Sequence, residues 1–333
     1  MTLRRLAIVV GDRSIATPPI GYGGLTRLAY AVAIECAALG IAVTLFAPLF
    51  RDDPALYRGL EGVGTFPPNT EALSTFDAIY CVDTTGLAAC AAALTVLSDK
   101  IFVLEENAPW LWSDTRPNLY HVLFRADRIP RLPQGRTWLV DQVLSRDEVG
   151  PPAPPEGYVL WLGRIHRDKG IEGIISFAEA RPDVRIRLAG PLAVRRRWPP
   201  NVKLIGEVAG AAKRALLTSA DALLYTVSSM WTGAGEGVLT EALACGLPIL
   251  AQAAGPGTPA SRCVVDGVNG FVHPDAAALA RLLPLAQRMD RVGNHHLAWT
   301  RLNPTHVAAD RIRRIDAALL TLHTSRRDAW RRL

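Results

Sequence analysis

Short apolar runs alternate with longer helical patterns along the chain, and this alternation limits the possible folds more than any other feature. Apolar runs of about four to eight residues, separated by helix-length segments, are typical of βαβ units, which form parallel sheets. In the first half of the chain we expect strands at 6–10, 42–46, 78–81, 101–104 and 138–140. In the second half we expect strands at 159–162, 185–189, 203–205, 222–225, 248–251 and 270–272. The pattern therefore predicts an α/β fold with two doubly wound parallel sheets.

Two helices are predicted most clearly. The first should run from 24 to 39, because Gly40 follows it and glycine commonly ends a helix. An amphipathic pattern from about 305 to 322 predicts a single terminal helix. This helix belongs to the second half of the sequence, although it could pack back on the first half.

The strongest boundary signal is the proline-rich segment 151–157, Pro-Pro-Ala-Pro-Pro-Glu-Gly. Proline has no amide hydrogen and a fixed φ, so this segment cannot lie inside a helix or a central strand. A chain of 333 residues with 49% hydrophobic content exceeds one typical domain of roughly 100 to 200 residues. We therefore expect an N-terminal domain at 1–150 and a C-terminal domain at 151–333.

Charge is distributed unevenly between these halves. Residues 1–150 contain 13 basic and 16 acidic residues, a net charge of −3, whereas residues 151–333 contain 24 and 15, a net charge of +9. The second half should therefore attract anions. Nucleic acid is not the expected partner, because the sequence has no helix-turn-helix, zinc-finger or aromatic RNA-binding motif and its arginines are dispersed.

Cysteine usage and hydropathy indicate the compartment. The five cysteines are an odd number with no C-x-x-C spacing, which favours buried, reduced thiols. The most helix-like apolar run, 87–97, is shorter than the roughly 20 residues that span a bilayer. The N-terminus also lacks the pattern of a signal peptide. We expect a cytoplasmic protein without a transmembrane segment, with peripheral membrane contact left open.

Two segments have the character of phosphate-binding sites. The segment 163–170 follows a predicted strand, and its glycines let a phosphate approach the backbone while Arg164 and Lys169 supply cations. The alternative is a turn with surface charges. In the segment 228–241 a glycine-rich loop leads into a helix, whose first amides can bind a diphosphate. Glu241 in that helix could accept hydrogen bonds from ribose hydroxyls, or simply stabilise the helix.

With these motifs in order, the chain resembles the family 4 glycosyltransferases, retaining enzymes with the two-domain GT-B fold. Residues 23–27, Gly-Gly-Leu-Thr-Arg, are similar to the family's N-terminal glycine loop. Residues 163–170 are similar to its G-R-x-x-x-x-K-G donor phosphate site, and residues 201–206 to a strand before the donor loop. Residues 241–248 are similar to the second half of its E-x7-E signature, and residues 266–272 to its D-G-x-x-G turn.

The resemblance implies a role for each matching residue. Arg164 and Lys169 would neutralise the departing diphosphate of a nucleotide sugar, and Glu241 would hold the ribose. The implied donor-binding residues are Gly24, Gly163, Glu236, Gly237, Val238 and Glu241. The partners would be a nucleotide sugar in the second domain and a glycosyl acceptor in the first. No cofactor and no metal would be required, and the sequence has no His, Cys, Asp and Glu grouping with metal-ligand spacing.

Two positions depart from the family pattern. Gly233 stands where the first glutamate of E-x7-E is expected, and Glu236 is the nearest acid. Glu105 stands where the family often has a histidine facing the acceptor and the donor sugar. A carboxylate at that position could act as a catalytic base, stabilise positive charge at the anomeric carbon, or be an exposed loop acid.

Three other functions remain as alternatives. A non-catalytic relative that binds a nucleotide sugar is suggested by the missing glutamate and histidine. A nicotinamide-dependent dehydrogenase would share the sheet type, but residues 9–13 after the first strand lack the G-x-G-x-x-G motif. A GT-B epimerase would convert nucleotide sugars without an acceptor, and a phosphorylase would need a pyridoxal-bearing lysine from a set of only four lysines.

Overall fold

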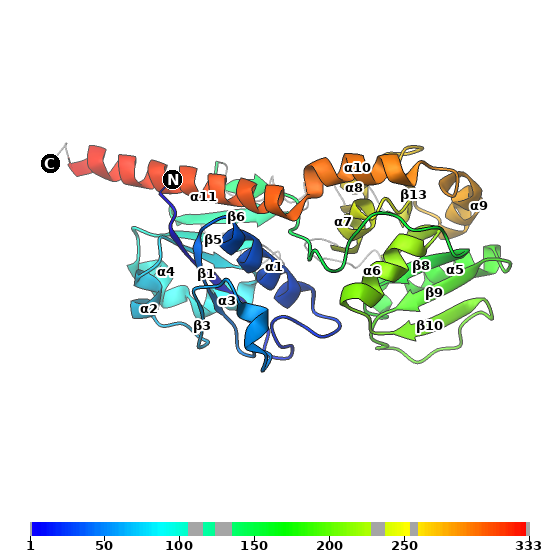
Figure 1. Ribbon diagram of the computed structural model, residues 1–333, viewed down its shortest axis with the longest axis horizontal. Helices are drawn as coiled ribbons and strands as arrows, with labels where there is room; N and C mark the ends of the chain where they lie inside the picture. Colours follow the sequence, from blue (N-terminus) through cyan, green and yellow to red (C-terminus); the bar gives the residue numbers. More distant parts are fainter. Residues whose placement is uncertain (1, 106–115, 124–134, 228–236, 254–258, 331–333) are drawn as a thin grey trace.

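The computed structural model describes residues 2–105, 116–123, 135–227, 237–253 and 259–330. The chain forms two α/β domains that lie side by side along the long axis of the molecule (Figure 1). Within the described residues, a seven-stranded sheet has the order β3-β2-β1-β4-β5-β6-β7 and a six-stranded sheet the order β10-β9-β8-β11-β12-β13. All pairings between these strands are parallel. The predicted pair of doubly wound parallel sheets is confirmed.

The first sheet contains the five strands expected from the sequence and two that were not expected. Its strands are β1 (Arg5–Val9), β2 (Ala42–Phe46), β3 (Gly62–Gly64), β4 (Ala78–Cys81), β5 (Ile101–Glu105), β6 (Leu119–Leu123) and β7 (Thr137–Leu139). The unexpected β3 is a three-residue edge strand with two glycines, so it has almost no apolar signal. The unexpected β6 has the polar residue His121 at its centre, which interrupts its apolar run.

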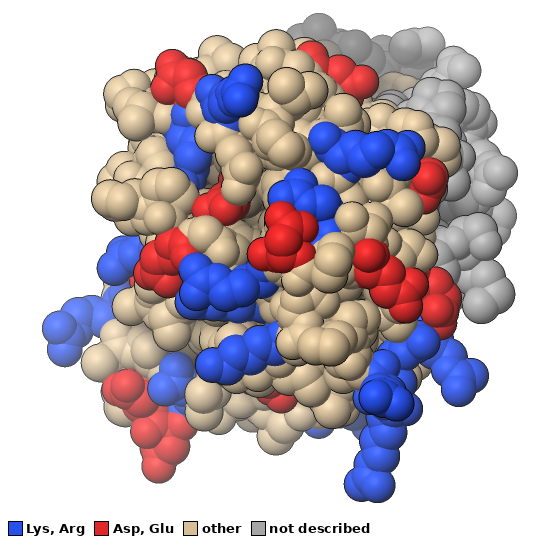
Figure 2. Space-filling model, turned by 90° about the vertical axis from the view of Figure 1, so that its right-hand side faces the viewer, with Lys and Arg blue, Asp and Glu red and all other residues tan. Residues whose placement is uncertain are grey.

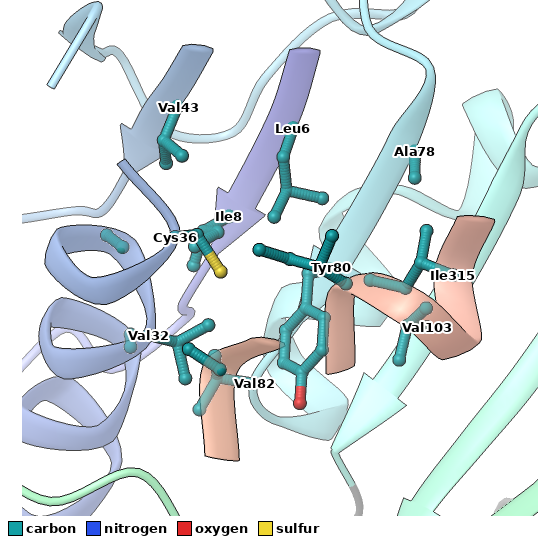
Figure 3. Packing of buried hydrophobic residues seen from close by; sticks show 14 of the residues in the cluster. Leu6, Ile8, Val32, Cys36, Val43, Ala78, Tyr80, Val82, Val103 and Ile315 are labelled. Carbon is teal, nitrogen blue, oxygen red and sulfur yellow. The ribbon is translucent and has the colours of Figure 1, made fainter. Parts of the chain in front are cut away.

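Helices cover both faces of the first sheet. They are α1 (Gly24–Ala38), α2 (Thr70–Ser74), α3 (Thr84–Ala89), α4 (Ala91–Val96) and the short 3-10 helix η1 (Pro54–Tyr57). Because successive residues of a strand point to opposite faces, Leu6 and Ile8 belong to the core beside α1, whereas Ala7 and Val9 pack on the side of α2 to α4. Figure 3 shows the first of these cores, where the side chains of the sheet meet those of α1 and of the terminal helix.

The second sheet agrees with the prediction in all six strands. They are β8 (Tyr158–Leu162), β9 (Arg185–Ala189), β10 (Val202–Gly206), β11 (Ala222–Tyr225), β12 (Ile249–Gln252) and β13 (Gly270–His273). The surrounding helices are η4 (Arg167–Lys169), α5 (Ile171–Ala180), α6 (Gly210–Ser219), α7 (Gly237–Ala244), α8 (Pro259–Cys263), α9 (Ala276–Ala286) and α10 (Arg291–Leu302). Two buried clusters fill the opposite faces of this sheet, one on the side of α5 and α9 and one on the side of α7 and α10.

The terminal helix α11 (Pro304–Trp330) leaves the second domain and lies across the first (Figure 1). Its residues Val307, Ile312, Ile315 and Leu319 are buried in the same core as α1. The helix was predicted to end near residue 322, but it continues to Trp330 because the residues after Leu322 include no glycine or proline that would break it. The chain therefore passes between the domains twice, once through the irregular connector 140–157 and once at the start of α11.

The cysteines and the hydropathy of the helices can also be compared with the predictions. All five cysteines are free and buried, as predicted. In the described part of the chain, no helix combines the length and the apolar character that crossing a bilayer demands.

Candidate functional site

A cavity of about 320 Å³ lies between the two domains. It is lined from both sides, by residues that follow strands of the first sheet and by residues that follow strands of the second. In open parallel sheets, ligands bind beyond the carboxyl ends of the strands, at the point where the strand order reverses. In each sheet that point lies between the first strand and the fourth, that is, between β1 and β4 and between β8 and β11. The cavity therefore lies where this topology places a ligand.

The loop after β8 brings two cations to the cavity. Arg164 and Lys169 both line it, together with Gly163. The Nη2 of Arg164 donates to Oδ2 of Asp168 at 3.2 Å, and the buried Nε of Arg164 has no hydrogen-bond partner among the described residues. Lys169 lies in the short helix η4 and is 8% exposed. The sequence-predicted pair of cations is thus present on one wall of the cavity.

Two glycines make this wall compact. Gly190, at the end of β9, has φ +139°, and a Cβ atom there would lie 1.9 Å from the carbonyl oxygen of Gly163. Gly170, between η4 and α5, has φ +67°, and a Cβ atom there would lie 2.7 Å from the amide nitrogen of Val227. Side chains at these positions would push the loop 163–170 away from the sheet.

Helix α7 begins at the cavity. Gly237 and Val238, its first two residues, line the cavity, and the amides of a helix's first turn have no partner within the helix. Glu241 on the next turn also lines the cavity and is 9% exposed. Glu236, predicted as a donor-binding residue, and Gly233 lie outside the described residues. The predicted arrangement of a helix N-terminus with a nearby carboxylate is present.

Glu241 belongs to a buried chain of alternating charges that the sequence did not reveal. The Nζ of Lys213, on α6, lies 2.6 Å from Oε1 of Glu241 and 2.9 Å from Oε2 of Glu148. The Nε of Arg27, on α1, lies 2.9 Å from the same oxygen of Glu148. The four side chains come from α1, the connector, α6 and α7, so no local motif could have indicated them.

The N-terminus of α1 forms part of the opposite wall. Gly23 and Gly24 line the cavity, and no side chain caps the helix, so its first amides are not occupied by a capping residue. A Cβ atom at Gly24 would meet nothing within 4 Å, which means that the predicted site residue faces open space. The amide of Tyr22 donates to Oε2 of Glu207 at 3.1 Å and so joins this loop to the second domain.

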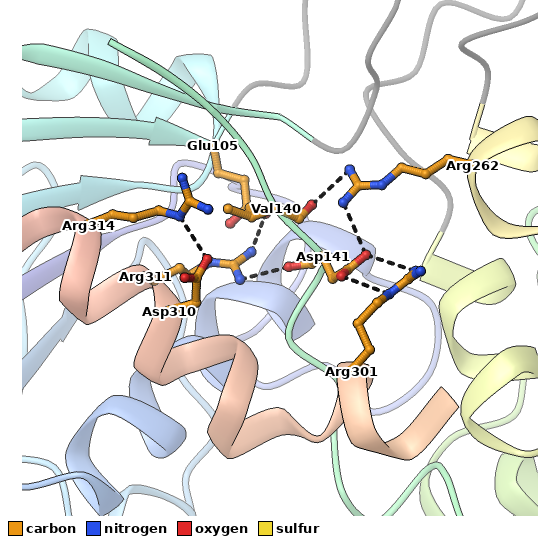
Figure 4. Close-up of polar contacts among 8 residues, drawn as sticks. All are labelled: Glu105, Val140, Asp141, Arg262, Arg301, Asp310, Arg311 and Arg314. Carbon is orange, nitrogen blue, oxygen red and sulfur yellow. Dashed lines mark hydrogen bonds and ion pairs between the residues drawn. The ribbon is translucent and has the colours of Figure 1, made fainter. Parts of the chain in front are cut away.

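Glu105 also lines the cavity, but it is not the exposed loop acid that was considered for this position. It is the last residue of β5, is 8% exposed, and is held by two buried side chains, of which Figure 4 shows Arg311. The hydroxyl of Tyr80 donates to its Oε2 at 2.6 Å, and Nη2 of Arg311 donates to its Oε1 at 2.9 Å. Burial raises the pKa of Tyr80, so its hydroxyl keeps its proton and remains a donor.

Arg311 comes from α11 and connects Glu105 to the connector between the domains. Burial lowers the pKa of its guanidinium, but the charge of Glu105 and the hydrogen bonds to Glu105 and Tyr80 raise that pKa by more, so the group stays charged. Its Nη1 donates to the carbonyl oxygen of Asp141 at 2.7 Å. The carboxylate of Asp141 in turn pairs with Arg262 at 3.2 Å and Arg301 at 3.1 Å, both from the second domain (Figure 4).

In the described part of the chain, no three His, Cys, Asp or Glu side chains group in a way that could hold a metal ion. On the face of the molecule in Figure 2, acidic and basic side chains are interspersed and form no continuous basic surface for nucleic acid.

The two sheet domains and the cavity between them define the fold as GT-B, the architecture of one large class of glycosyltransferases. The chain is similar to AviGT4, a glycosyltransferase of avilamycin A biosynthesis, with 19% identity, a TM-score of 0.72, and coverage of 96% of this chain and 98% of that one. It is also similar to WaaG, a glycosyltransferase of lipopolysaccharide biosynthesis, with 16% identity, a TM-score of 0.60, and coverage of 92% and 98%.

A third similar structure is the pneumococcal O-GlcNAc transferase GtfA in complex with UDP and GlcNAc. It has 12% identity and a TM-score of 0.51, with coverage of 73% of this chain and 57% of that one. Residues 156–284 match the family model described as glycosyl transferases group 1. No curated protein matches the chain. The family match and the fold together support sugar transfer as the general activity.

Proposed function

We propose that this chain is a retaining glycosyltransferase that moves a sugar from a nucleotide-diphosphate donor to an acceptor without a metal ion. The observation that carries this proposal is the convergence of Arg164, Lys169 and the N-terminus of α7 on one cavity between the domains. Two cations and a helix N-terminus suit a diphosphate better than a neutral ligand. The UDP in the complex of the pneumococcal transferase is a nucleoside diphosphate, the kind of group that such a donor releases.

In the proposed reaction, the bond between the anomeric carbon and the diphosphate oxygen breaks. Negative charge then grows on the leaving diphosphate, so cations fixed around it stabilise the transition state more than the ground state. Arg164 and Lys169 supply those cations, and the first amides of α7 supply hydrogen-bond donors. By comparison with the loss of one oxyanion donor, removing Arg164 should lower kcat by about 100-fold.

Glu105 would face the sugar or the acceptor from the first domain. Both of its carboxylate oxygens already accept hydrogen bonds, one from Tyr80 and one from Arg311. The contacts with Arg311 and Tyr80 therefore favour one of the two catalytic roles considered for Glu105, the stabilisation of positive charge at the anomeric carbon, over proton abstraction.

The proposal is tested with the purified chain and a panel of nucleotide sugars, measuring binding by thermal shift and turnover by release of the nucleoside diphosphate. Arg164→Ala should lose nucleotide affinity and turnover. The matched control is Arg167→Ala, in the same loop, because Arg167 is exposed and is not among the residues lining the cavity. Equal losses in the two variants would contradict the role of Arg164.

Two further measurements separate this function from its alternatives. The anomeric configuration of the product, read from its NMR coupling constant, should match that of the donor, and turnover should persist in EDTA. Binding of a nucleotide sugar without release or transfer above the Arg164→Ala background would identify a non-catalytic relative instead. Conversion of the donor to an epimer without an acceptor would identify an epimerase.

A further inference from the structure

Lys213 is buried in the wall of the cavity, next to the carboxylate to which we assign the ribose. It is 6% exposed on α6, and its Nζ donates to Oε1 of Glu241 and to Oε2 of Glu148. An ammonium has three donors, and these two carboxylates take two of them. Lys213 also lines the cavity itself, so the pair that it forms with Glu241 faces the ligand space.

The two oxygens of Glu241 have different surroundings. Its Oε1 lies 2.6 Å from Lys213, whereas its Oε2 has no partner among the described residues. Oε2 is not fully enclosed by protein atoms. Because Glu241 lines the cavity, this oxygen is accessible from it. One oxygen is therefore fixed by a cation and the other is left to accept a hydrogen bond.

The neighbouring charges make Lys213 hard to replace. Without its ammonium, the carboxylates of Glu148 and Glu241 would be buried close together, and only Glu148 would keep a cation, through Nε of Arg27 at 2.9 Å. A buried carboxylate without a partner is strongly disfavoured and turns toward solvent or takes up a proton. Glu241 would then lose its fixed orientation.

We propose that Lys213 is a positioning residue for the nucleoside of the donor. It holds Oε1 of Glu241 so that Oε2 accepts a hydrogen bond from a ribose hydroxyl, and the pair thereby distinguishes ribose from deoxyribose. This inference rests on the proposed nucleotide-sugar function and adds to it a residue that determines specificity. A buried acceptor left without its hydroxyl should weaken the binding of the deoxy form by about tenfold or more.

The test compares the affinities of nucleoside diphosphates with those of their 2′-deoxy and 3′-deoxy forms by isothermal titration calorimetry. The wild-type protein should bind at least one deoxy form about tenfold more weakly. In Lys213→Met this ratio should fall toward one, and Lys213→Arg should restore much of it because the charge is retained. The matched control is Lys203→Met, since Lys203 is an exposed lysine on β10.

Each outcome bears on a different claim. If the wild-type protein binds no nucleoside diphosphate, the proposed donor class is wrong. If it binds them without preferring ribose, or if Lys213→Met keeps the wild-type ratio, the role of Lys213 is refuted while the donor class stands. Should Lys213→Met fail to fold by circular dichroism, Lys213→Gln replaces it and must show the same loss of selectivity.

Discussion

Replacing Arg311 with methionine would leave the carboxylate of Glu105 buried without its cation. Arg311 is 1% exposed and donates to Tyr80 at 3.0 Å, to Asp141 at 2.7 Å and to Glu105 at 2.9 Å. Methionine fills much of the volume but makes none of these hydrogen bonds. Removing one partner of a buried ion pair costs about 3–5 kcal/mol, because the other charge stays buried and unpaired. At about 2–4 °C per kcal/mol, we expect the Tm to fall by roughly 10 °C.

A double variant separates the lost pair from a simple loss of packing. In Glu105→Gln/Arg311→Met the carboxylate is gone, so the buried charge no longer needs a partner. The Tm of the double variant should therefore lie several degrees above that of Arg311→Met, as measured by differential scanning calorimetry. A fall of less than about 2 °C in Arg311→Met, or a double variant no more stable than the single one, would show that the cost of the orphaned charge has been overestimated.

Three further predictions concern stability and access. Burial alone raises the pKa of Asp316, but hydrogen bonds from the backbone amides of Leu3 and its neighbour lower it below the ordinary value. The stabilisation of the folded protein by this carboxylate is therefore full at neutral pH and is lost as the pH falls below about 4. The difference in Tm between the wild type and Asp316→Asn should shrink between pH 7 and pH 3.5. The five cysteines should resist a thiol reagent at pH 8 until the protein unfolds, because all five are buried and burial raises the pKa of three of them to about 12. Rapid labelling of the native protein would contradict this. Gly190→Ala should lower the Tm far more than Gly24→Ala, because its methyl group would overlap the carbonyl of Gly163; equal Tm values would refute the close contact.

The sequence predicted those parts of the fold whose signal is local. Four strands of the second sheet are mainly apolar runs, and β9 and β10 combine apolar residues with Arg or Lys, so all six were recognised. The strand β3 was missed because it is short and glycine-rich, and β6 was missed because the buried polar residue His121 divides its apolar run into two short pairs. Whether such a segment forms a strand is decided by its pairing with neighbouring strands, and this pairing cannot be seen in the sequence of the segment alone.

In the candidate site too, the residues that belong to local motifs were predicted and those with distant partners were not. Arg164, Lys169 and Glu241 were predicted because each belongs to a motif whose residues are near one another in the chain. Lys213 and Arg311 were not predicted, since their partners are distant; Arg311 and Glu105 are 206 residues apart. Charged side chains on a helix are usually solvent-exposed, and only tertiary packing shows that these two are buried.

The return of α11 to the first domain affects how the protein must be synthesised. The strands of that domain are complete by residue 139, yet the apolar face beside α1 is covered by side chains as late as Leu319. During translation, the nascent sheet would emerge from the ribosome with that face uncovered until α11 had also been made. A fragment ending at residue 150 should therefore aggregate, and the first domain should depend on chaperones until α11 has been made.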